Sequence, residues 1–169
     1  IELENAIVLA RQQADDPVWY TNYHNYDDNK AYCQALAAAY PTICQYFVLG
    51  TSLQGRDIFG LRITGPGSTA NRPATIWWAG QHAREWATVP TVEYCGEQLL
   101  TRYATDPHIQ FVVDNVETII VPIMNPDGYV YTWTNNRLWR KNRRPNSNNP
   151  NPGCSTNFGV DLNRNWGYQ

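Results

Sequence analysis

Residues 74–88, ATIWWAGQHAREWAT, join a short apolar run directly to a polar stretch that carries a histidine and a glutamate. The run ATIWWAG is continuous, as in a central strand that is buried on both faces of a sheet. A helix is expected to follow, since Pro90 suits a first helical turn. Within that helix, apolar residues recur on one stripe, at Val92, Cys95, Leu99 and Tyr103. The segment thus predicts a strand, a polar loop and a helix in succession.

The same alternation continues on both sides of this segment. Capping residues and breakers such as Pro41 delimit two more helices, and short apolar runs delimit three more strands. These elements are a helix from Asp27 or Asp28 to about Tyr40, strands at 44–50 and 58–64, a helix at 106–116 and a strand at 117–124. Strands that alternate with helices predict an α/β fold with a largely buried, mixed sheet. The 169 residues contain no internal repeat and no interdomain linker, so we expect one domain.

The composition argues against some classes of function. A net charge of -2 gives the chain as a whole no attraction to nucleic acid or to an anionic lipid surface. No apolar run approaches the roughly 20 residues of a membrane-spanning helix, so we expect no membrane span. The chain begins at Ile1 and not at methionine, which a removed signal peptide, a removed pro-segment or the boundary of an expressed fragment would each produce.

The four cysteines bear on the redox environment. Cys33, on the alanine-rich helix, and Cys44, at the start of the next strand, could form a bridge that stabilises the fold by about 2–3 kcal/mol. The alternative is two reduced thiols, as in a cytosolic protein. Cys95 is expected to be a buried thiol in mid-helix. Cys154 lies in a polar loop and has no evident partner within the chain.

His82 and Glu85 stand three residues apart in the polar part of the opening segment. On a helical turn, positions i and i+3 share a face, so the imidazole and the carboxylate could bind one ion. Zinc accepts nitrogen and oxygen ligands, and α/β folds place their sites at strand ends such as this one. The alternative is a capping histidine and a surface glutamate, and the pair alone does not decide between them.

From Thr132 onward the sequence becomes rich in asparagine, proline and arginine and loses its periodicity, so this stretch is functional or poorly ordered. Guanidinium groups bind carboxylates through paired hydrogen bonds, and Asn163 places an amide beside Arg164. Zinc with such a clamp would suit cleavage of the last peptide bond of a chain. A solvated loop, a phosphate-binding patch and a polar turn are the alternatives. Five basic residues lie close together here, namely Arg137, Arg140, Lys141, Arg143 and Arg144.

Four motifs occur in order along the chain: GQHAREW (80–86), NPDGY (125–129), NRLWRKNR (136–143) and GVDLNRNW (159–166). Through them the chain resembles the zinc metallocarboxypeptidases of the carboxypeptidase A/B type. The resemblance runs from residue 23 to residue 166 and implies an α/β/α sandwich around a mixed, twisted sheet of eight strands. Residues 1–169 would be the N-terminal portion of one catalytic domain, so the fold is expected to be incomplete in this chain.

The resemblance also implies a role for each matching residue. In such an enzyme one zinc ion and a nearby arginine polarise the scissile carbonyl, and an asparagine–arginine pair holds the free C-terminal carboxylate of a peptide or protein substrate. On this basis the zinc ligands would be His82 and Glu85, the catalytic arginine Arg140, the substrate-binding residues Asn163 and Arg164 with Arg84 and Arg137 in secondary positions, and the supporting residues Asp161 and Trp166.

The family's third zinc ligand, a histidine, lies beyond the last motif, as do a substrate-capping tyrosine and the glutamate that acts as general base. The chain ends at Gln169, before all three. His108 would not replace the ligand, because TDPHIQ is expected to be an exposed helix start. We therefore expect a second chain that carries the remainder, with the break after Tyr168.

Secreted members of the family commonly carry a disulfide in the loop before the last motif, which would join Cys154 to the second chain. The resemblance thus implies a secreted, extracellular zinc exopeptidase made as a zymogen. Two other hypotheses remain. One is a catalytically inactive module that binds peptide C termini. The other is a nucleic-acid-binding module that uses the arginines at 137–144, against which the net charge counts.

Overall fold

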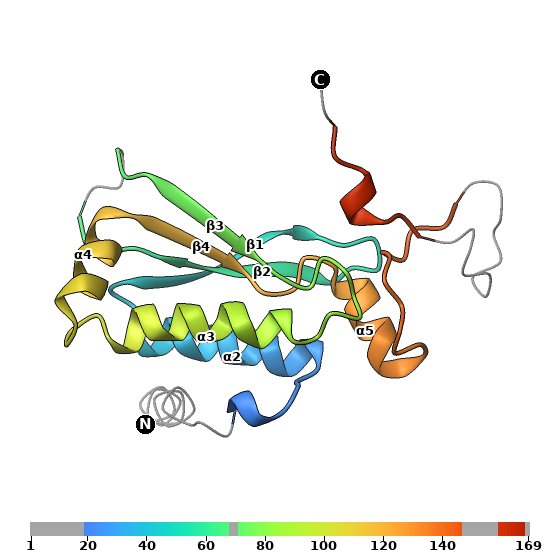
Figure 1. Cartoon of the computed structure of the whole chain (residues 1–169), viewed down its shortest axis with the longest axis horizontal. Coiled ribbons are helices and arrows are strands. Elements are labelled where there is room, and N and C mark those ends of the chain that lie inside the picture. Colours follow the sequence, from blue (N-terminus) through green and yellow to red (C-terminus); the bar gives the residue numbers. More distant parts are fainter. Residues whose placement is uncertain (1–18, 68–70, 147–158, 168–169) are drawn as a thin grey trace.

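The computed structural model describes residues 19–67, 71–146 and 159–167 (Figure 1). Its centre is a four-stranded sheet with helices packed against it. The elements in chain order are η1 (Trp19–Thr21), α2 (Tyr26–Ala39), β1 (Cys44–Thr51), β2 (Asp57–Ile63), β3 (Ala74–Trp78), α3 (Thr88–Thr101), α4 (Pro107–Asn115), β4 (Glu117–Val121), α5 (Pro126–Thr134) and η2 (Leu162–Arg164). None of the described helices is long and apolar enough to cross a membrane.

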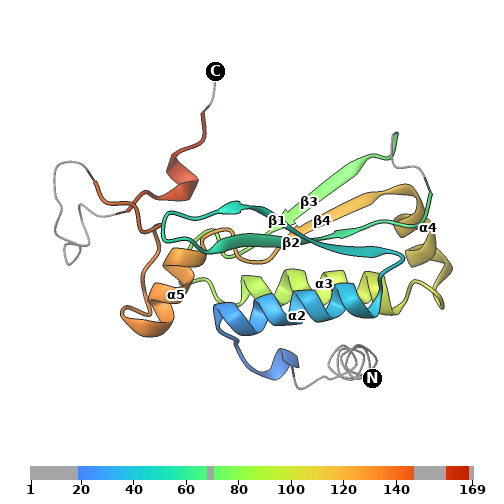
Figure 2. The same cartoon turned by 180° about the vertical axis from the view of Figure 1, so that it is seen from behind.

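The sheet is mixed and has the strand order β1-β2-β4-β3. β1 pairs with β2, and β2 with β4, in antiparallel register, whereas β3 and β4 run parallel. α2 and α3 lie side by side along one face of the sheet (Figures 1 and 2). Helices and strands share one apolar core that includes Leu36, Phe59, Leu61 and Ile120. The predicted α/β fold with a mixed sheet is confirmed.

β3 departs from the prediction of a central strand that is buried on both faces. It is an edge strand of the described sheet, and its side chains alternate between exposed and half-buried. Trp77 packs against the core, so its neighbours Ile76 and Trp78 point away from α2 and α3. They expose 53% and 45% of their surface. The described residues cover one face and one edge of β3, and they supply four of the eight strands that the resemblance implies.

α2 begins earlier than expected and has a different cap. Asn25 has an extended backbone, and its side-chain oxygen accepts hydrogen bonds from the backbone N–H groups of Asp27 (2.9 Å) and Asp28 (3.0 Å). Asn25 is therefore the N-cap, in place of either aspartate. The two aspartates lie in the first turn instead, where their charge is stabilised by the helix dipole.

α3 buries Leu99 of the expected stripe, and its buried face continues on neighbouring positions. Val92 and Cys95 are only half-buried, whereas Gly96 and Leu100 pack against the sheet. Gly96 permits this contact, because a Cβ atom there would lie 2.5 Å from Cδ1 of Ile120. The buried thiol expected at Cys95 is thus a half-buried one, at the edge of the contact between α3 and the sheet.

The buried face of α3 also carries two carboxylic acids that apolar spacing does not reveal. Glu93 and Glu97 are 1% and 2% exposed. Burial raises the pKa of Glu93 well above its usual range, and the charge of Glu97 adds to the effect. The nearby Trp19 side chain acts to lower this pKa but is outweighed. The folded protein therefore favours the protonated form of Glu93 more strongly than the unfolded chain does.

The predicted bridge between Cys33 and Cys44 is not formed in the structure, where both residues are free, buried thiols. They belong to the apolar core between α2 and the sheet. Burial raises the pKa of Cys33 well above its usual range and that of Cys44 to about 12. Both thiols therefore pack as small apolar groups and not as reactive thiolates. Cys154 lies outside the described residues.

Candidate metal centre

The loop between β3 and α3 is held against the end of β4. Ala79 donates its backbone N–H to Val121 and accepts one from Met124, both at 2.9 Å. Gly80 has a φ of +58°, and a Cβ atom there would lie 3.1 Å from the carbonyl oxygen of Pro122. Glycine thus lets the chain turn close to its neighbour. The loop emerges at the carboxyl ends of two parallel strands, where α/β sheets place their sites.

His82 and Glu85 converge within this loop. Nδ1 of His82 lies 3.0 Å from Oε1 and 3.1 Å from Oε2 of Glu85. The His82 side chain is 10% exposed and that of Glu85 43%. Zinc bonds of about 2.0–2.2 Å in tetrahedral geometry separate two ligand atoms by about 3.4 Å. The pair is therefore arranged as two ligands of one ion could be, in contrast to the alternative of a cap and an unrelated surface glutamate.

The other ring nitrogen of His82 faces Asp161. Nε2 is buried and makes no hydrogen bond within the described residues, and Oδ1 of Asp161 lies 3.4 Å away. Burial acts to raise the pKa of Asp161, but hydrogen bonds from Arg140 and from the Asn163 backbone, with the charges of Arg140 and His82, outweigh it and hold this pKa below its usual range. Asp161 is thus an anion behind the imidazole ring. Across the described ranges, no group of three His, Cys, Asp or Glu side chains is placed to hold a metal.

Arg140 lies between the two carboxylates. Its Nε donates to Oδ2 of Asp161 at 2.9 Å, and its Nη1 lies 3.6 Å from Oε1 of Glu85. Its backbone oxygen accepts the N–H of Ala83 at 3.1 Å, which ties the segment after α5 to the loop after β3. The structure therefore brings together three sequence-predicted residues, His82, Glu85 and Arg140, from distant parts of the chain.

Asn125 is a residue of this region whose importance the sequence analysis missed. It is 3% exposed, and its Nδ2 donates to the backbone oxygens of Gln81 (3.2 Å) and Lys141 (3.0 Å). Its Oδ1 accepts the N–H of Gly128 and so caps α5. The order Asn-Pro at 125–126 is a recognisable helix start, and it is the one signal that could have revealed α5. The hydrogen bonds from Asn125 to Gln81 and Lys141 cannot be predicted from any local sequence pattern.

The last described segment is attached through Asn142. Its backbone N–H donates to the oxygen of Val160 at 3.0 Å, and its Oδ1 accepts the N–H of Val160 at 2.7 Å. Gly159 has a φ of +83°, and a Cβ atom there would lie 2.3 Å from the carbonyl oxygen of Asn142. These contacts fix the start of η2, and with it Asp161, beside Arg140.

Asn163 and Arg164 follow Asp161 on η2, and both are exposed. The backbone N–H of Asn163 donates to Oδ1 of Asp161 at 3.0 Å, and Nη1 of Arg164 donates to the oxygen of Asn163 at 2.7 Å. The predicted carboxylate clamp is therefore adjacent in the chain to the carboxylate that faces His82. Trp166 is 65% exposed, with its ring centroid 6.2 Å from that of Trp78.

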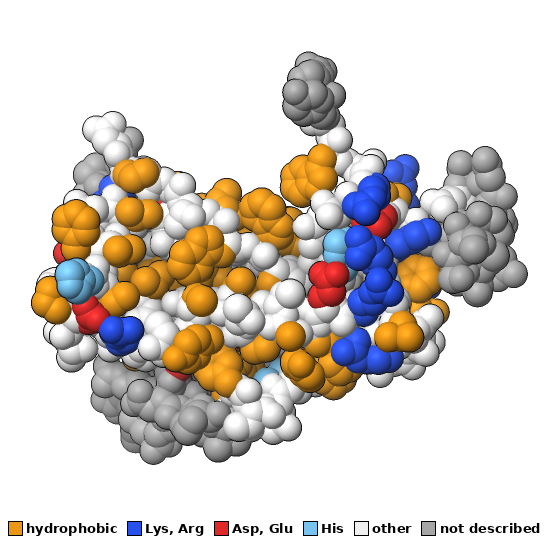
Figure 3. Space-filling view, in the orientation of Figure 1, with side chains coloured by type: hydrophobic (Ala, Val, Ile, Leu, Met, Phe, Trp, Pro, Cys, Tyr) orange, Lys and Arg blue, Asp and Glu red, His pale blue; other side chains and the backbone are white. Residues whose placement is uncertain are grey.

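Arg84, the residue before Glu85 in the chain, lies next to Arg137. Both are exposed, and Nη1 of Arg137 donates to the backbone oxygen of Arg84 at 2.9 Å. Figure 3 shows the Lys and Arg side chains gathered in a stripe at the end of the molecule where α5 lies, with a histidine and an acidic side chain beside it. His108 is exposed at the start of α4, at the opposite end of the molecule (Figure 1).

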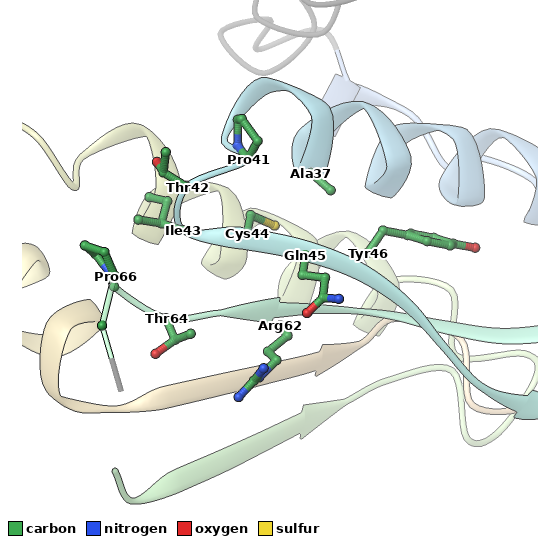
Figure 4. A pocket seen from close by; sticks show the side chains of 12 residues that line it. Ala37, Pro41, Thr42, Ile43, Cys44, Gln45, Tyr46, Arg62, Thr64 and Pro66 are labelled. Atoms are coloured by element: carbon green, nitrogen blue, oxygen red, sulfur yellow. The ribbon is translucent and has the colours of Figure 1, made fainter. Parts of the chain in front are cut away.

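A cavity of about 640 Å³ lies elsewhere, where the end of α2 meets β1 and β2 (Figure 4). Its charged lining residue, Arg62, forms a two-pronged ion pair with Glu117, with bonds of 2.9 and 2.8 Å. That pairing raises the pKa of Arg62 and lowers the pKa of Glu117. The cavity contains no ligand set of the kind seen at His82 and is not a second candidate site.

Comparison with known proteins agrees with this geometry. The family model for zinc carboxypeptidases matches residues 29–169. Metallocarboxypeptidase A of Trichophyton rubrum is 44% identical over 156 residues, which cover 92% of this chain and 36% of that protein. Inactive metallocarboxypeptidase ecm14 of Schizosaccharomyces pombe is 35% identical over 157 residues, which cover 89% of this chain and 30% of that protein. The chain thus spans about a third of the length of these relatives.

Solved structures show the same fold. Carboxypeptidase A from Helicoverpa armigera superposes with a TM-score of 0.77 at 32% identity, over 98% of this chain and 39% of that one. The thrombin-activatable fibrinolysis inhibitor also gives a TM-score of 0.77, at 27% identity, over 96% of this chain and 40% of that one. The sheet and its helices are therefore part of a carboxypeptidase fold, and the chain belongs to the zinc carboxypeptidase family.

Proposed function

We propose that this chain supplies the zinc-binding and carboxylate-binding half of an exopeptidase that hydrolyses the C-terminal peptide bond of peptides and proteins. The observation that carries the proposal is the convergence of His82 with Glu85 at 3.0 Å, backed by Asp161 and flanked by Arg140. A cap and an unrelated surface glutamate would not require this network. The family supplies the reaction class.

His82 and Glu85 would hold the zinc, because an imidazole nitrogen and a carboxylate are ligands that zinc accepts and both face one point. Zinc bound there would supply Lewis-acid polarisation of the scissile carbonyl and activation of a water molecule. Asp161 faces Nε2, and a hydrogen bond donated by Nε2–H to its carboxylate would leave the lone pair of Nδ1 directed toward Glu85. The ring would then be held in the tautomer that binds metal.

Arg140 would stabilise the negative charge that develops on the carbonyl oxygen. Its guanidinium is held by Asp161 through Nε, which leaves other N–H groups for the substrate. Asn163 and Arg164 would bind the terminal carboxylate, since a guanidinium and an amide together match its two oxygens. A peptide without a free carboxylate would leave these donors unpaired, and this requirement would make the enzyme an exopeptidase.

The remaining parts of the centre are expected outside this chain. We propose that a third ligand and a general base arrive with a second polypeptide, held by strand pairing and by a bridge from Cys154, in a secreted protein. The chain covers 36% of metallocarboxypeptidase A of Trichophyton rubrum, which leaves room for both groups. Intact mass of the native protein under non-reducing and reducing conditions tests this point. A single 19.3 kDa species under both conditions would contradict it.

The function is tested with the native protein and matched peptides that end in a free carboxylate or in an amide. We expect release of the C-terminal residue from the free peptides only. Chelation should abolish the release, and added zinc should restore it. Equal cleavage of the amides would contradict the clamp, and activity that survives complete zinc removal would contradict the metal centre.

A second candidate is an inactive module that binds C termini. It is favoured by one relative, a protein named an inactive metallocarboxypeptidase, which is 35% identical to this chain. Such a module would bind the free peptides more tightly than the amides and release nothing. Binding and turnover measured on the same peptides therefore separate the two functions.

A further inference from the structure

Arg143 is buried, unlike Arg137 and Arg144, which lie near it in the chain and are exposed. Its exposed fraction is 7%. Its Cζ lies 3.7 Å from the centroid of the Tyr131 ring and 4.5 Å from the centroid of the Trp139 ring. The two rings pack edge to face, with centroids 5.2 Å apart and an interplanar angle of 73°. Because a guanidinium stays charged when it is buried, Arg143 is a fixed cation held against two aromatic rings.

Trp139 and Arg143 close a short loop of the chain, and Arg140 lies within that loop. The contact between the indole and the guanidinium joins the two ends of the loop. Nε1 of Trp139 also donates to the backbone oxygen of Asn142 at 3.3 Å. Since the ends of the loop are tied to each other through side chains, the place of the Arg140 backbone depends on how Trp139 and Arg143 pack.

The same side chains meet the loop after β3. Trp139 is 6% exposed and forms a small apolar cluster with Ala83, which is fully buried, and Tyr131 packs against this cluster. Ala83 stands between the two proposed zinc ligands in the chain, and its backbone N–H donates to the backbone oxygen of Arg140 at 3.1 Å. The Arg140 backbone is therefore held by Ala83 on one side and by the packing of Trp139 with Arg143 on the other.

The side chain of Arg140 needs this support more than the zinc ligands do. Its contacts with Asp161 (2.9 Å) and Glu85 (3.6 Å) join segments that are far apart in the chain. A hydrogen-bond donor for an oxyanion has to be placed accurately, and a shift of about 1 Å can cost about 100-fold in rate. His82 and Glu85, in contrast, are joined within one turn, where the N–H of Glu85 donates to the oxygen of His82 at 3.1 Å.

We propose that Arg143 is a positioning residue for the reaction. By packing against Tyr131 and Trp139, it sets the place of the Arg140 backbone and so aims the guanidinium of Arg140 at the scissile carbonyl. The inference rests on the proposed exopeptidase function and adds a residue to it. Arg143 acts through Arg140, so its contribution belongs to the transition state and not to the binding of zinc or of the ground-state substrate.

The test is a double-mutant cycle in the native protein, with a peptide that has a free C-terminal carboxylate. Arg143→Met keeps the length of the side chain and removes its charge and its plane. It should lower kcat about 10- to 100-fold, while KM and the zinc affinity, measured by competition with a chelator, stay within about threefold of the wild type. In an Arg140→Ala background the same substitution should lower kcat by less than about threefold, because the group that it positions is already absent.

Tyr131→Leu approaches the same packing from a half-buried position, which perturbs folding less than a change at Arg143. It removes the ring that lies closest to the guanidinium, so kcat should fall here too, whereas Tyr131→Phe keeps the ring and should retain most of kcat. Arg62→Met is the matched control. It removes an arginine that pairs with Glu117 in the sheet, so it should lower the melting temperature and leave kcat per folded molecule unchanged.

The cycle separates failure of this inference from failure of the proposed function. A wild-type kcat in Arg143→Met would show that other contacts position Arg140. Equal losses of kcat in the wild-type and Arg140→Ala backgrounds would show that Arg143 supports the fold as a whole, and a loss confined to KM or to zinc affinity would place its action elsewhere in the centre. Wild-type protein that releases no terminal residue would overturn the proposed function, and the inference with it, before any variant is compared.

Discussion

At the scale of single residues, Asp161 organises the candidate centre. It lies 3.4 Å from Nε2 of His82, and it accepts hydrogen bonds from Nε of Arg140 and from the backbone of Asn163. One carboxylate thus orients a proposed zinc ligand, a proposed oxyanion donor and the start of the proposed clamp. Its low pKa keeps it ionised at neutral pH, so all three interactions are made by an anion.

Asp161→Asn should therefore weaken zinc binding by about 10–100-fold, because the amide can turn a donor toward Nε2 and no longer fixes the metal-binding tautomer. Competition with a chelator of known affinity, on the native protein, measures the change. Asp114→Asn is the control. Asp114 lies in α4, where its carboxylate accepts a hydrogen bond from Tyr103, so this variant should bind zinc as the wild type does. Equal zinc affinity in Asp161→Asn would show that the ring is oriented by other groups.

Arg140→Ala should lower kcat about 10²–10³-fold with a small change in KM, because the negative charge it stabilises develops only in the transition state. Steady-state kinetics on a peptide with a free carboxylate provide the measurement. Lys141→Ala is the neighbouring control, since its side chain makes no ion pair within the described ranges. A loss confined to KM would mean that Arg140 binds the ground-state substrate instead.

Glu93 provides a prediction about pH. Its pKa is raised in the folded protein, first by burial, so the fold favours the protonated form. The resulting stability is fully present below the unfolded pKa of about 4.3 and is lost as pH rises through the higher folded pKa. The free energy of unfolding should therefore fall from weakly acidic toward alkaline pH, and Glu93→Gln should fall less steeply.

Denaturant unfolding of the native protein between pH 5 and pH 9 measures this slope. Glu117→Gln is an informative control, because the pKa of Glu117 is lowered by the hydrogen bond from Arg62 and its stabilisation lies above the unfolded pKa. Removing it should cost stability at neutral pH and regain none at alkaline pH. Parallel slopes for wild type and Glu93→Gln would indicate that Glu93 is ionised when folded.

At the scale of elements, the sequence predicted what local patterns determine. Four strands and three helices were identified because apolar periodicity and breakers act over a few residues. It missed α5, because the helix is short and its Asn-Pro start was not recognised as a cap. It also predicted that β3 is buried on both faces, whereas one face is exposed among the described residues. An apolar run shows that a strand suits a buried environment, but it does not show which residues bury it. Buried Glu93 escaped notice because apolar spacing ignores carboxylates.

The candidate site was predictable only in part for the same reason. His82 and Glu85 are three residues apart, and a turn in which the N–H of Glu85 donates to the oxygen of His82 brings them together. Arg140 contacts Glu85 across 55 positions and Asp161 faces His82 across 79, and only the resemblance to a family indicated them. Asn125, which ties the loop after β3 to the segment after α5, was not assigned a role by either route.

α5 approaches Asn125 and Lys141 closely at Gly128. A Cβ atom there would lie 2.6 Å from Nδ2 of Asn125 and 2.7 Å from the oxygen of Lys141. Gly128→Ala should displace both, destabilise the protein by about 1–3 kcal/mol and reduce peptidase activity. Gly50→Ala is the control, since no atom lies within 4 Å of the added methyl. Thermal unfolding and kcat/KM for both variants decide the matter, and equal behaviour would mean that α5 shifts to make room.

At the scale of the whole molecule, the described residues leave one face of the sheet bare. A cavity of about 390 Å³ opens on it, with Leu49, Ile76, Trp78 and Trp166 among its lining residues. Each of these four side chains exposes 45% or more of its surface. Apolar groups gathered in this way are normally covered in a soluble protein, by a partner or by further chain. We propose further chain as the cover, since the 156 matched residues make up only 36% of metallocarboxypeptidase A of Trichophyton rubrum.

The isolated 169-residue chain should therefore behave differently from the native protein. We expect it to bind a dye for exposed apolar surface strongly and to associate at micromolar concentration, because one edge of β3 is unpaired in the described sheet. We also expect it to bind zinc weakly and to hydrolyse no peptide, because the two ligands found among the described residues do not complete a zinc site. Ile76→Thr with Trp78→Ser should reduce the dye binding and association of the isolated chain without conferring activity. In the native protein the same two substitutions should weaken the attachment of the proposed second chain. The two chains should then separate at a lower denaturant concentration than in the wild type. A monomeric, active 169-residue chain with little dye binding would show that these residues need no cover.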